Sequence, residues 1–164
     1  MGSTDYACDD DGIAFITINN PSRKNAMTYQ MIEEMYRHLT VAGNEARVVI
    51  LTGAEDAFCA GIDLNFLSDI PPEERGIKVP THDENGLWNI TACPIPVIAA
   101  VNGPAVGMGA EWTSHCDIRI ASRNSRFSWN FSHRGLIADT GAGTWLLPRP
   151  VSYTHLTLPT KRIV

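Results

Sequence analysis

Two apolar runs of strand length each lead into a segment of small residues and glycines. The runs are residues 48–52 and 97–101, and the segments are 57–64 (AFCAGIDL) and 102–111 (NGPAVGMGAE). Glycine lets a ligand come close to the backbone. A helix that begins at such a junction presents unpaired N–H groups and the positive end of its dipole. Two such junctions facing one point could hold one developing oxyanion.

Strand-like runs alternate with helical periodicity along the whole chain. Strands are expected at 13–18, 48–52, 97–101 and 118–121, and helices at 27–39, 63–67, 108–114 and 141–148. This alternation predicts an α/β fold with at least partly parallel strand pairing. Gly43–Asn44 is expected to end the first helix, the acidic residues 9–11 to belong to a solvated terminus, and the proline-rich, charged segment 68–85 to be a mobile excursion.

Length and charge limit the function classes. The chain has 164 residues, 44% of them hydrophobic, which suits one domain with a core. With 13 basic and 18 acidic residues the net charge is −5, so neither a nucleic-acid partner nor a membrane is expected. No run approaches the ~20 apolar residues of a membrane span, and residues 1–11 show no signal-peptide pattern. Four widely spaced cysteines predict free thiols, mostly buried, a cytoplasmic setting and no metal site.

Five motifs, in this order and spacing, resemble the crotonase, or enoyl-CoA hydratase/isomerase, superfamily. They are RKNAM at 23–27, FCAGIDL at 58–64, NGPAVGMGAE at 102–111, CDIRIA at 116–121 and RGLIAD at 134–139. The resemblance implies a crotonase-type ββα spiral core over residues 1–150. It also implies hydration of an enoyl-CoA, or a shift of its double bond, through an enolate. CoA is then part of the substrate, no other cofactor is expected, and the full-length protein is expected to form trimers or dimers of trimers.

The same resemblance assigns the catalytic residues. The backbone N–H groups of Ile62 and Met108 would bind the thioester oxygen as an oxyanion hole. Glu111 lies one helical turn after Met108 and would act as an acid or base. Phe131 stands where hydratases carry a second glutamate, so a two-glutamate water addition is in question. Asp139 matches an aspartate that many isomerases use.

The CoA contacts implied by the resemblance come largely from backbone. They are expected around Ala26, Ala60, Ile62 and Leu64, while Arg23 or Lys24 would meet phosphates.

Plainer interpretations stand beside these roles. Glu111 could be a glutamate favoured by the helix dipole, and Asp139 could be a helix N-cap. The glycines at 103, 107 and 109 also fit a short-chain dehydrogenase that binds NAD(P), but no tyrosine is followed by lysine four residues later. A further alternative is an inactive fragment that binds acyl-CoA without turnover.

The last fourteen residues break the pattern of the chain. Residues 151–164 (VSYTHLTLPTKRIV) show no helical period, cap or core face. The string VSYTHLTLPT resembles a translated adapter from sequencing libraries. We therefore expect this tail to be non-native and the C-terminal helical part of the family fold to be missing.

Overall fold

The computed structural model describes residues 2–74, 89–135 and 143–147. Five strands form the main sheet in the order β1-β2-β3-β4-β6, and two form a small sheet, β5-β7. The strands are β1 (Ser3–Cys8), β2 (Ile13–Asn19), β3 (Val48–Gly53), β4 (Val97–Val101), β5 (Pro104–Val106), β6 (Ile118–Ala121) and β7 (Arg126–Ser128). The helices are α1 (Tyr29–Glu45), α2 (Leu64–Ser68), α3 (Met108–His115) and α4 (Gly143–Leu146), with 3₁₀ turns η1 (Pro21–Arg23), η2 (Pro72–Glu74) and η4 (Ser132–Arg134).

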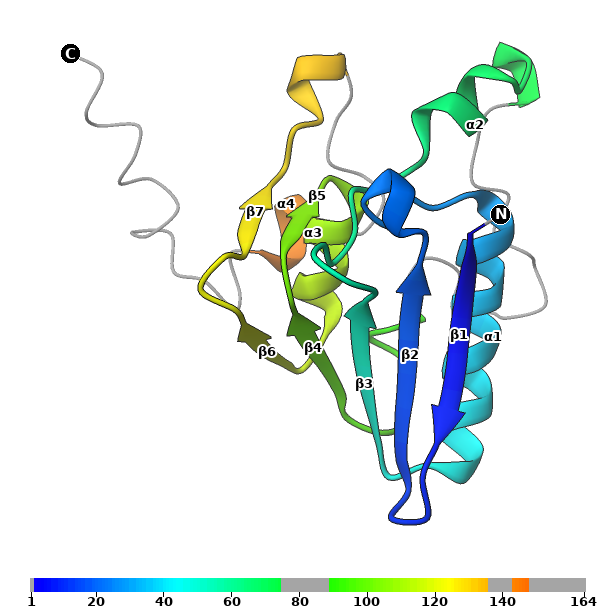
Figure 1. Ribbon diagram of the computed structural model, residues 1–164, viewed down its shortest axis with the longest axis vertical. Helices are drawn as coiled ribbons and strands as arrows, with labels where there is room; N and C mark the ends of the chain where they lie inside the picture. Colours follow the sequence, from blue (N-terminus) through cyan, green and yellow to red (C-terminus); the bar gives the residue numbers. More distant parts are fainter. Residues whose placement is uncertain (1, 75–88, 136–142, 148–164) are drawn as a thin grey trace.

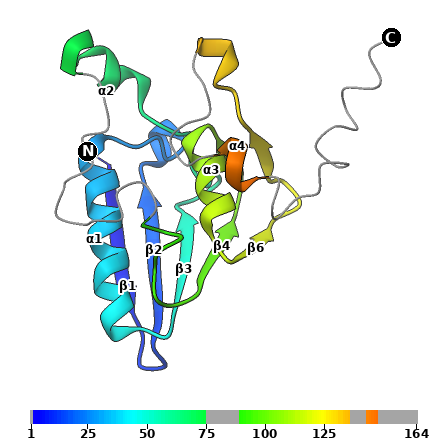
Figure 2. The same ribbon diagram turned by 180° about the vertical axis from the view of Figure 1, so that it is seen from behind.

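Pairing in the main sheet is mixed. β1 runs antiparallel to β2, whereas β2, β3, β4 and β6 run parallel to their neighbours. The α/β class with partly parallel pairing is therefore confirmed. Helices α1 and α3 lie on the same side of this sheet (Figures 1 and 2).

The core lies between the sheet and these helices. Every second residue of β2, β3 and β4 is buried there, since successive strand side chains point to opposite faces. Helix α1 adds the apolar stripe that its helical spacing predicts: Met31, Ile32, Met35, Tyr36, Leu39 and Ala42. This packing fixes the sheet edge from which the glycine-rich junctions emerge.

The N-terminus is a strand, β1, which was not predicted from the sequence; the acidic residues 9–11 are exposed as expected, but they follow this strand instead of forming a terminus. Thr4 is buried and its hydroxyl donates to the Met31 carbonyl (2.9 Å), while the Tyr6 hydroxyl donates to Glu45 (2.7 Å). These contacts with α1 and the pairing with β2 are non-local, and the polar residues of β1 gave no local strand signal. Asp9, by contrast, is in the exposed hairpin turn, where its carboxylate accepts from the Ile13 amide (2.8 Å).

Helix α1 also ends later than predicted. It passes through Gly43–Asn44 and ends at Glu45, and the Asn44 side chain donates to the Thr40 carbonyl within the helix (2.9 Å). Gly43 has no room for a larger residue without moving Pro94, which lies 3.0 Å from where its Cβ would be. The predicted helix at 141–148 is present as α4, and residues 75–88 of the predicted excursion lie outside the described residues.

Candidate active site

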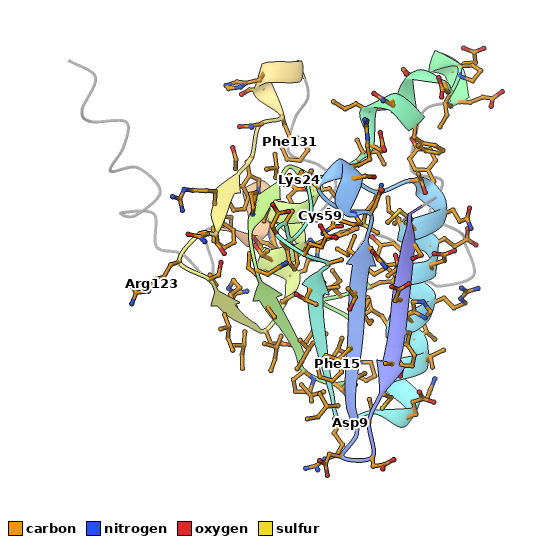
Figure 3. All side chains as sticks on the ribbon, viewed as in Figure 1. Asp9, Phe15, Lys24, Cys59, Arg123 and Phe131 are labelled. Carbon is orange, nitrogen blue, oxygen red and sulfur yellow. The ribbon has the colours of Figure 1, made fainter. Side chains whose placement is uncertain are left out.

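The loop after β3 lies between two other segments of the chain. On one side, the Ala60 amide donates to the Lys24 carbonyl (3.0 Å) and the Met27 amide to the Gly61 carbonyl (2.8 Å). On the other side, the Cys59 amide donates to the Pro104 carbonyl (3.2 Å), and the Val106 amide to the Cys59 carbonyl (2.9 Å). The loop is thus the middle strand of a short irregular ladder. Figure 3 shows Lys24, Cys59 and Phe131 gathered at one end of the molecule, with Asp9 at the other.

At Gly61 the alternating direction of the backbone N–H and C=O groups along this loop shifts by one residue. In an extended strand, the N–H and C=O of one residue share a side and those of the next face the other side. Cys59 faces β5 and Ala60 faces Lys24, but the Gly61 carbonyl then turns to Met27 rather than to β5. Its φ of 91°, which favours glycine, permits this turn.

The shift points the Ile62 amide away from residues 24–27. In a trans peptide the C=O of Gly61 and the N–H of Ile62 point in opposite directions, so this N–H faces the side of β5 and α3. From Phe58 to Asp63, Ile62 is the one residue whose amide has no acceptor among the residues that the structure describes. This direction, toward β5 and α3, agrees with the predicted role of the Ile62 amide as the first donor.

The second junction places another free amide beside the first. Gly107 precedes α3 with φ 55° and ψ −122°, and its own N–H donates to the Ser128 carbonyl of β7 (2.8 Å). The next amide, that of Met108, has no acceptor within the described part of the chain. A Cβ built on Gly61 would lie 3.6 Å from this Met108 nitrogen. The fold brings the two predicted donors together.

Glu111 follows in the first turn of α3. Its amide donates to the Gly107 carbonyl (3.0 Å), and its side chain is fully buried. A carboxylate enclosed in this way, one turn from the Met108 amide, is in a low-dielectric setting where its interaction with a bound thioester would be strong. Asp139 lies outside the described residues, so its predicted role stays a prediction.

Phe131 presents an apolar ring to the same junction. The tip of the ring, Cζ, lies 3.9 Å from where a Cβ on Gly107 would be. The side chain that stands in place of a second glutamate therefore faces the turn before Met108. It cannot exchange protons, and it makes this side of the site apolar.

Two asparagines hold the turn that starts the loop, and sequence reasoning did not single them out. The Asn25 side chain is fully buried and donates to the carbonyls of Ala54 (2.8 Å) and Ala57 (2.7 Å). The Asn102 amide donates to the carbonyls of Gly53 (2.8 Å) and Ala57 (3.2 Å). Both asparagines lie in the motifs quoted above, but their partners are distant in sequence.

The residues predicted to contact CoA lie in this loop, in the segment 23–27 that pairs with it, and at the start of α2. Arg23 and Lys24 are exposed, and their charges already meet carboxylates. Arg23 Nη2 lies 3.0 Å from Asp63, and Lys24 Nζ lies 2.7 Å from Asp56. The remaining predicted contacts differ in burial: Ala26 is buried, Ala60 and Ile62 are half-buried, and Leu64 is exposed.

The remaining candidates are structural. His115 is buried and its Nδ1 lies 2.9 Å from the Thr91 hydroxyl. Within residues 2–74, 89–135 and 143–147, no group of three His, Cys, Asp or Glu side chains could hold a metal ion. Over the same residues no helix is long and apolar enough to cross a membrane.

The four cysteines are free thiols that differ in burial. Cys59 and Cys116 are buried, Cys93 is half-buried and Cys8 is exposed, so two of the four thiols, and not most of them, are buried.

Comparison with known proteins decides the family. The family model for enoyl-CoA hydratase/isomerase matches residues 9–155. The chain belongs to this family. Its fold is that of the crotonase core: an enoyl-CoA hydratase/isomerase structure from Pseudoalteromonas atlantica matches 94% of the chain with a TM-score of 0.80 and 31% identity, and 60% of that structure is covered.

Curated relatives in the enoyl-CoA hydratase/isomerase family carry two kinds of name. A "probable enoyl-CoA hydratase" of Rhodobacter capsulatus is 40% identical over 86% of this chain and 54% of its own length. An "ethylmalonyl-CoA decarboxylase" of Xenopus laevis is 34% identical over 89% of this chain and 50% of its own length. The chain thus spans about half the length of the curated relatives that it matches.

Proposed function

We propose that this chain carries the thioester-binding and proton-transfer half of an enoyl-CoA hydratase/isomerase. One observation supports this most strongly. In two adjoining loops, the amides of Ile62 and Met108 are left without acceptors in the described structure, and a Cβ built on Gly61, the residue before Ile62, would lie 3.6 Å from the Met108 nitrogen. A thioester oxygen is an acceptor that fits such a pair.

The reaction follows from where charge develops. When water adds to the β-carbon of a 2-enoyl-CoA, or a base removes the α-proton of a 3-enoyl-CoA, an electron pair moves onto the thioester oxygen. The two amides hold this oxyanion. Each donor of this kind typically contributes ~3 kcal/mol to lowering the barrier. Protonation of the enolate at carbon then completes hydration or moves the double bond.

Glu111 is the proposed acid and base. In hydration it takes a proton from the attacking water, and in isomerisation it takes the α-proton and returns a proton at the γ-carbon. Asp139 is the proposed second carboxylate, because Phe131 cannot serve. CoA would be held by backbone around Ala26, Ala60, Ile62 and Leu64, with Arg23 or Lys24 near its phosphates.

The Glu111→Gln variant tests this assignment. We expect kcat to fall 10²–10⁴-fold for 2-enoyl-CoA or 3-enoyl-CoA, because a positioned proton-transfer group typically contributes that much. The affinity for CoA should persist, since other segments bind it. Glu33→Gln on the exposed side of α1 is the control and should turn over at the wild-type rate. Wild-type turnover in both Glu111→Gln and Asp139→Asn would contradict both roles.

Phe131 favours a second candidate function, decarboxylation of a 2-carboxyacyl-CoA. Cleavage of the bond between the α-carbon and the carboxylate releases CO₂ and leaves the electron pair as the same enolate, which then takes a proton. No base is required. An apolar ring beside the junction disfavours the charged carboxylate and so favours its loss. The decarboxylase name of a 34% identical relative agrees with this candidate.

Product analysis separates the two candidates. If decarboxylation is the function, we expect the protein to release CO₂ from ethylmalonyl-CoA faster than it hydrates 2-enoyl-CoA. Phe131→Glu should then slow CO₂ release by more than tenfold. Faster turnover of enoyl-CoA, with no CO₂ released from ethylmalonyl-CoA, excludes this candidate.

The assembly and cellular setting are also proposals. For the full-length protein we propose a cytoplasmic homotrimer, or a dimer of trimers, that works in fatty acid metabolism as a lyase or isomerase. Apolar Phe15, Ile50, Ile98 and Ile118 stand in register across the sheet face opposite α1, and such a row suits coverage by another part of an assembly. Sedimentation of the purified protein gives its mass and tests the trimer.

A further inference from the structure

Cys59 lies where the two loops of the candidate site meet. Its backbone pairs with Pro104 and Val106 on the β5 side, and its Sγ accepts a hydrogen bond from the Gly61 amide (3.4 Å). The side chain is fully buried, and burial raises the pKa of the thiol to about 12. The thiol is therefore neutral at physiological pH and is not a nucleophile.

The Cys59 sulfur is the acceptor that the Gly61 N–H needs once the hydrogen-bond directions along the loop have shifted. Once the alternation is broken there, the Gly61 N–H has no backbone acceptor in the described structure, and Sγ is its partner. A buried N–H without any acceptor is costly. Without this bond, the Ala60–Gly61 peptide would gain by rotating toward another acceptor, and the Ile62 N–H, one peptide further along the chain, would be displaced with it.

The neighbouring helix confirms how closely Cys59 is fitted. A Cβ built on Gly109 of α3 would lie 2.7 Å from the Cβ of Cys59. Helix α3, which carries the Met108 amide, therefore packs directly against Cys59. The same residue contacts both the loop of the first donor and the helix of the second.

We propose that Cys59 is a positioning residue for the oxyanion hole. Its Sγ holds the N–H of the Ala60–Gly61 peptide while the Met27 amide holds the Gly61 carbonyl, and together these two hydrogen bonds fix the turn at Gly61 that directs the Ile62 N–H at the thioester oxygen. The inference rests on the proposed function, in which that N–H binds the oxygen. It adds a side chain that sets the geometry without touching substrate.

The test compares Cys59→Ala, which removes the acceptor, with Cys59→Ser, which keeps one. We expect kcat to fall by about 10- to 100-fold in Cys59→Ala with KM little changed, because a misplaced group of this kind can cost about that much. Cys59→Ser should restore kcat to within a few-fold of wild type. Cys116→Ala is the matched control: this thiol is also buried, but it donates to the Trp112 carbonyl at the other end of α3.

A spectroscopic readout separates positioning from mere packing. In wild type, the infrared carbonyl stretch of a bound, ¹³C-labelled acyl-CoA thioester should move to lower frequency as the two amides polarise it. The displacement should shrink in Cys59→Ala and return in Cys59→Ser. If Cys59→Ala lowers the Tm as Cys116→Ala does, with kcat and the carbonyl frequency unchanged, the role is structural and the proposal is overturned.

Two further outcomes decide the remaining cases. Should Cys59→Ala fail to fold, a folded Cys59→Ser variant with wild-type kcat and carbonyl frequency supports the proposal, and one with a tenfold lower kcat overturns it. If wild-type protein neither polarises a bound thioester nor turns over any acyl-CoA, the proposed function itself fails. If the wild-type enzyme polarises a bound thioester and turns over acyl-CoA, and Cys59→Ala is equally active, only the proposed role of Cys59 is excluded.

Discussion

At the scale of single residues, backbone geometry defines the candidate site. Gly61 (φ 91°) and Gly107 (φ 55°) adopt conformations that other residues rarely take, and each stands immediately before one proposed donor. Side chains act mainly by fixing this backbone: Asn25 and Asn102 hold the turn before it, and Cys59 holds the Gly61 amide. Residue identity therefore matters here through shape and hydrogen bonding more than through charge.

Asp63 caps the helix that follows the first donor. Its carboxylate accepts from the Asn65 amide (2.9 Å), the Phe66 amide (3.4 Å) and Arg23 (3.0 Å). Burial disfavours its charged form, but the Arg23 guanidinium and the two amides outweigh burial and hold the pKa of Asp63 below its ordinary value of 3.8. A depressed pKa means that the ionised carboxylate stabilises the folded state.

The pH dependence of this contribution has a definite sign. It is fully present above pH 3.8, the ordinary value, and is lost as the pH falls through the lower pKa of the folded protein. Asp63→Ala should lower the free energy of unfolding at pH 7 by ~1 kcal/mol, as for other N-caps, with the half-exposed Arg23 adding little. Urea unfolding at pH 7 and at pH 3 measures this, and the difference from wild type should shrink at pH 3.

Asp56 provides the matched control for this experiment. It pairs with Lys24 at 2.7 Å, but both side chains are exposed. Asp56→Ala should leave the stability at pH 7 unchanged. An equal loss in both variants would show that Asp63 acts through general surface charge rather than as a cap.

Motifs could predict some of these residues and not others. The two glycine-flanked helix starts have a local sequence signature, whereas Ile62, Met108 and Glu111 were assigned to their roles through the resemblance to the family. Asn25 and Asn102 lie inside the quoted motifs, yet their task is to satisfy carbonyls about 30 to 50 residues away. Cys59 was first interpreted as one more buried thiol, because its Gly61 contact exists only once the loop has its shifted geometry.

At the scale of elements, the contact between α3 and the first loop is the critical one. Gly109 in α3 faces Cys59 with no room for a side chain, since a Cβ would lie 2.7 Å from the Cys59 Cβ and closer still to its carbonyl oxygen. Helix propensity alone favours alanine over glycine by about 1 kcal/mol. Overpacking of a core contact costs ~1–3 kcal/mol and should prevail.

Gly109→Ala should therefore destabilise the protein, although alanine has a higher helix propensity than glycine. We expect the free energy of unfolding in urea to fall by up to about 2 kcal/mol, which is the overpacking cost less the gain in helix propensity, and kcat to fall as the two donors separate. Gly43→Ala in α1 is the comparison, because its neighbour is the exposed side chain of Pro94, which can yield. Gly43→Ala should change stability by less than ~1 kcal/mol. If both variants are equally stable, α3 does not press on Cys59 as described.

Element prediction succeeded where the signal was local. The apolar runs of β2, β3, β4 and β6 were predicted close to their observed bounds, and the apolar stripe of α1 was predicted although this helix continues past its expected end at Gly43–Asn44. β1 was missed because its polar residues become a strand only through β2 and α1. β5 was missed because three residues beginning with Pro104 carry no period, and its pairing with β7 and Cys59 is long-range.

At the scale of the whole molecule, the fold brings the segments of the candidate site together at one edge of the main sheet. The loops after β3 and β4 leave neighbouring parallel strands, so their glycine-rich segments meet although about forty residues separate them. Ligands bind at this edge of parallel sheets in many α/β proteins. The chain spans about half the length of the curated relatives that it matches, and the two segments that carry Ile62, Met108 and Glu111 adjoin within it.

The most direct test of this account is a crystal structure of the protein with a saturated acyl-CoA, which binds without reacting. We expect the thioester oxygen to lie at hydrogen-bond distance, about 3 Å, from the amide nitrogens of both Ile62 and Met108. We also expect the α-carbon to face Glu111. A thioester oxygen bound elsewhere, with either amide turned away or hydrogen-bonded to another protein group, would contradict the central claim.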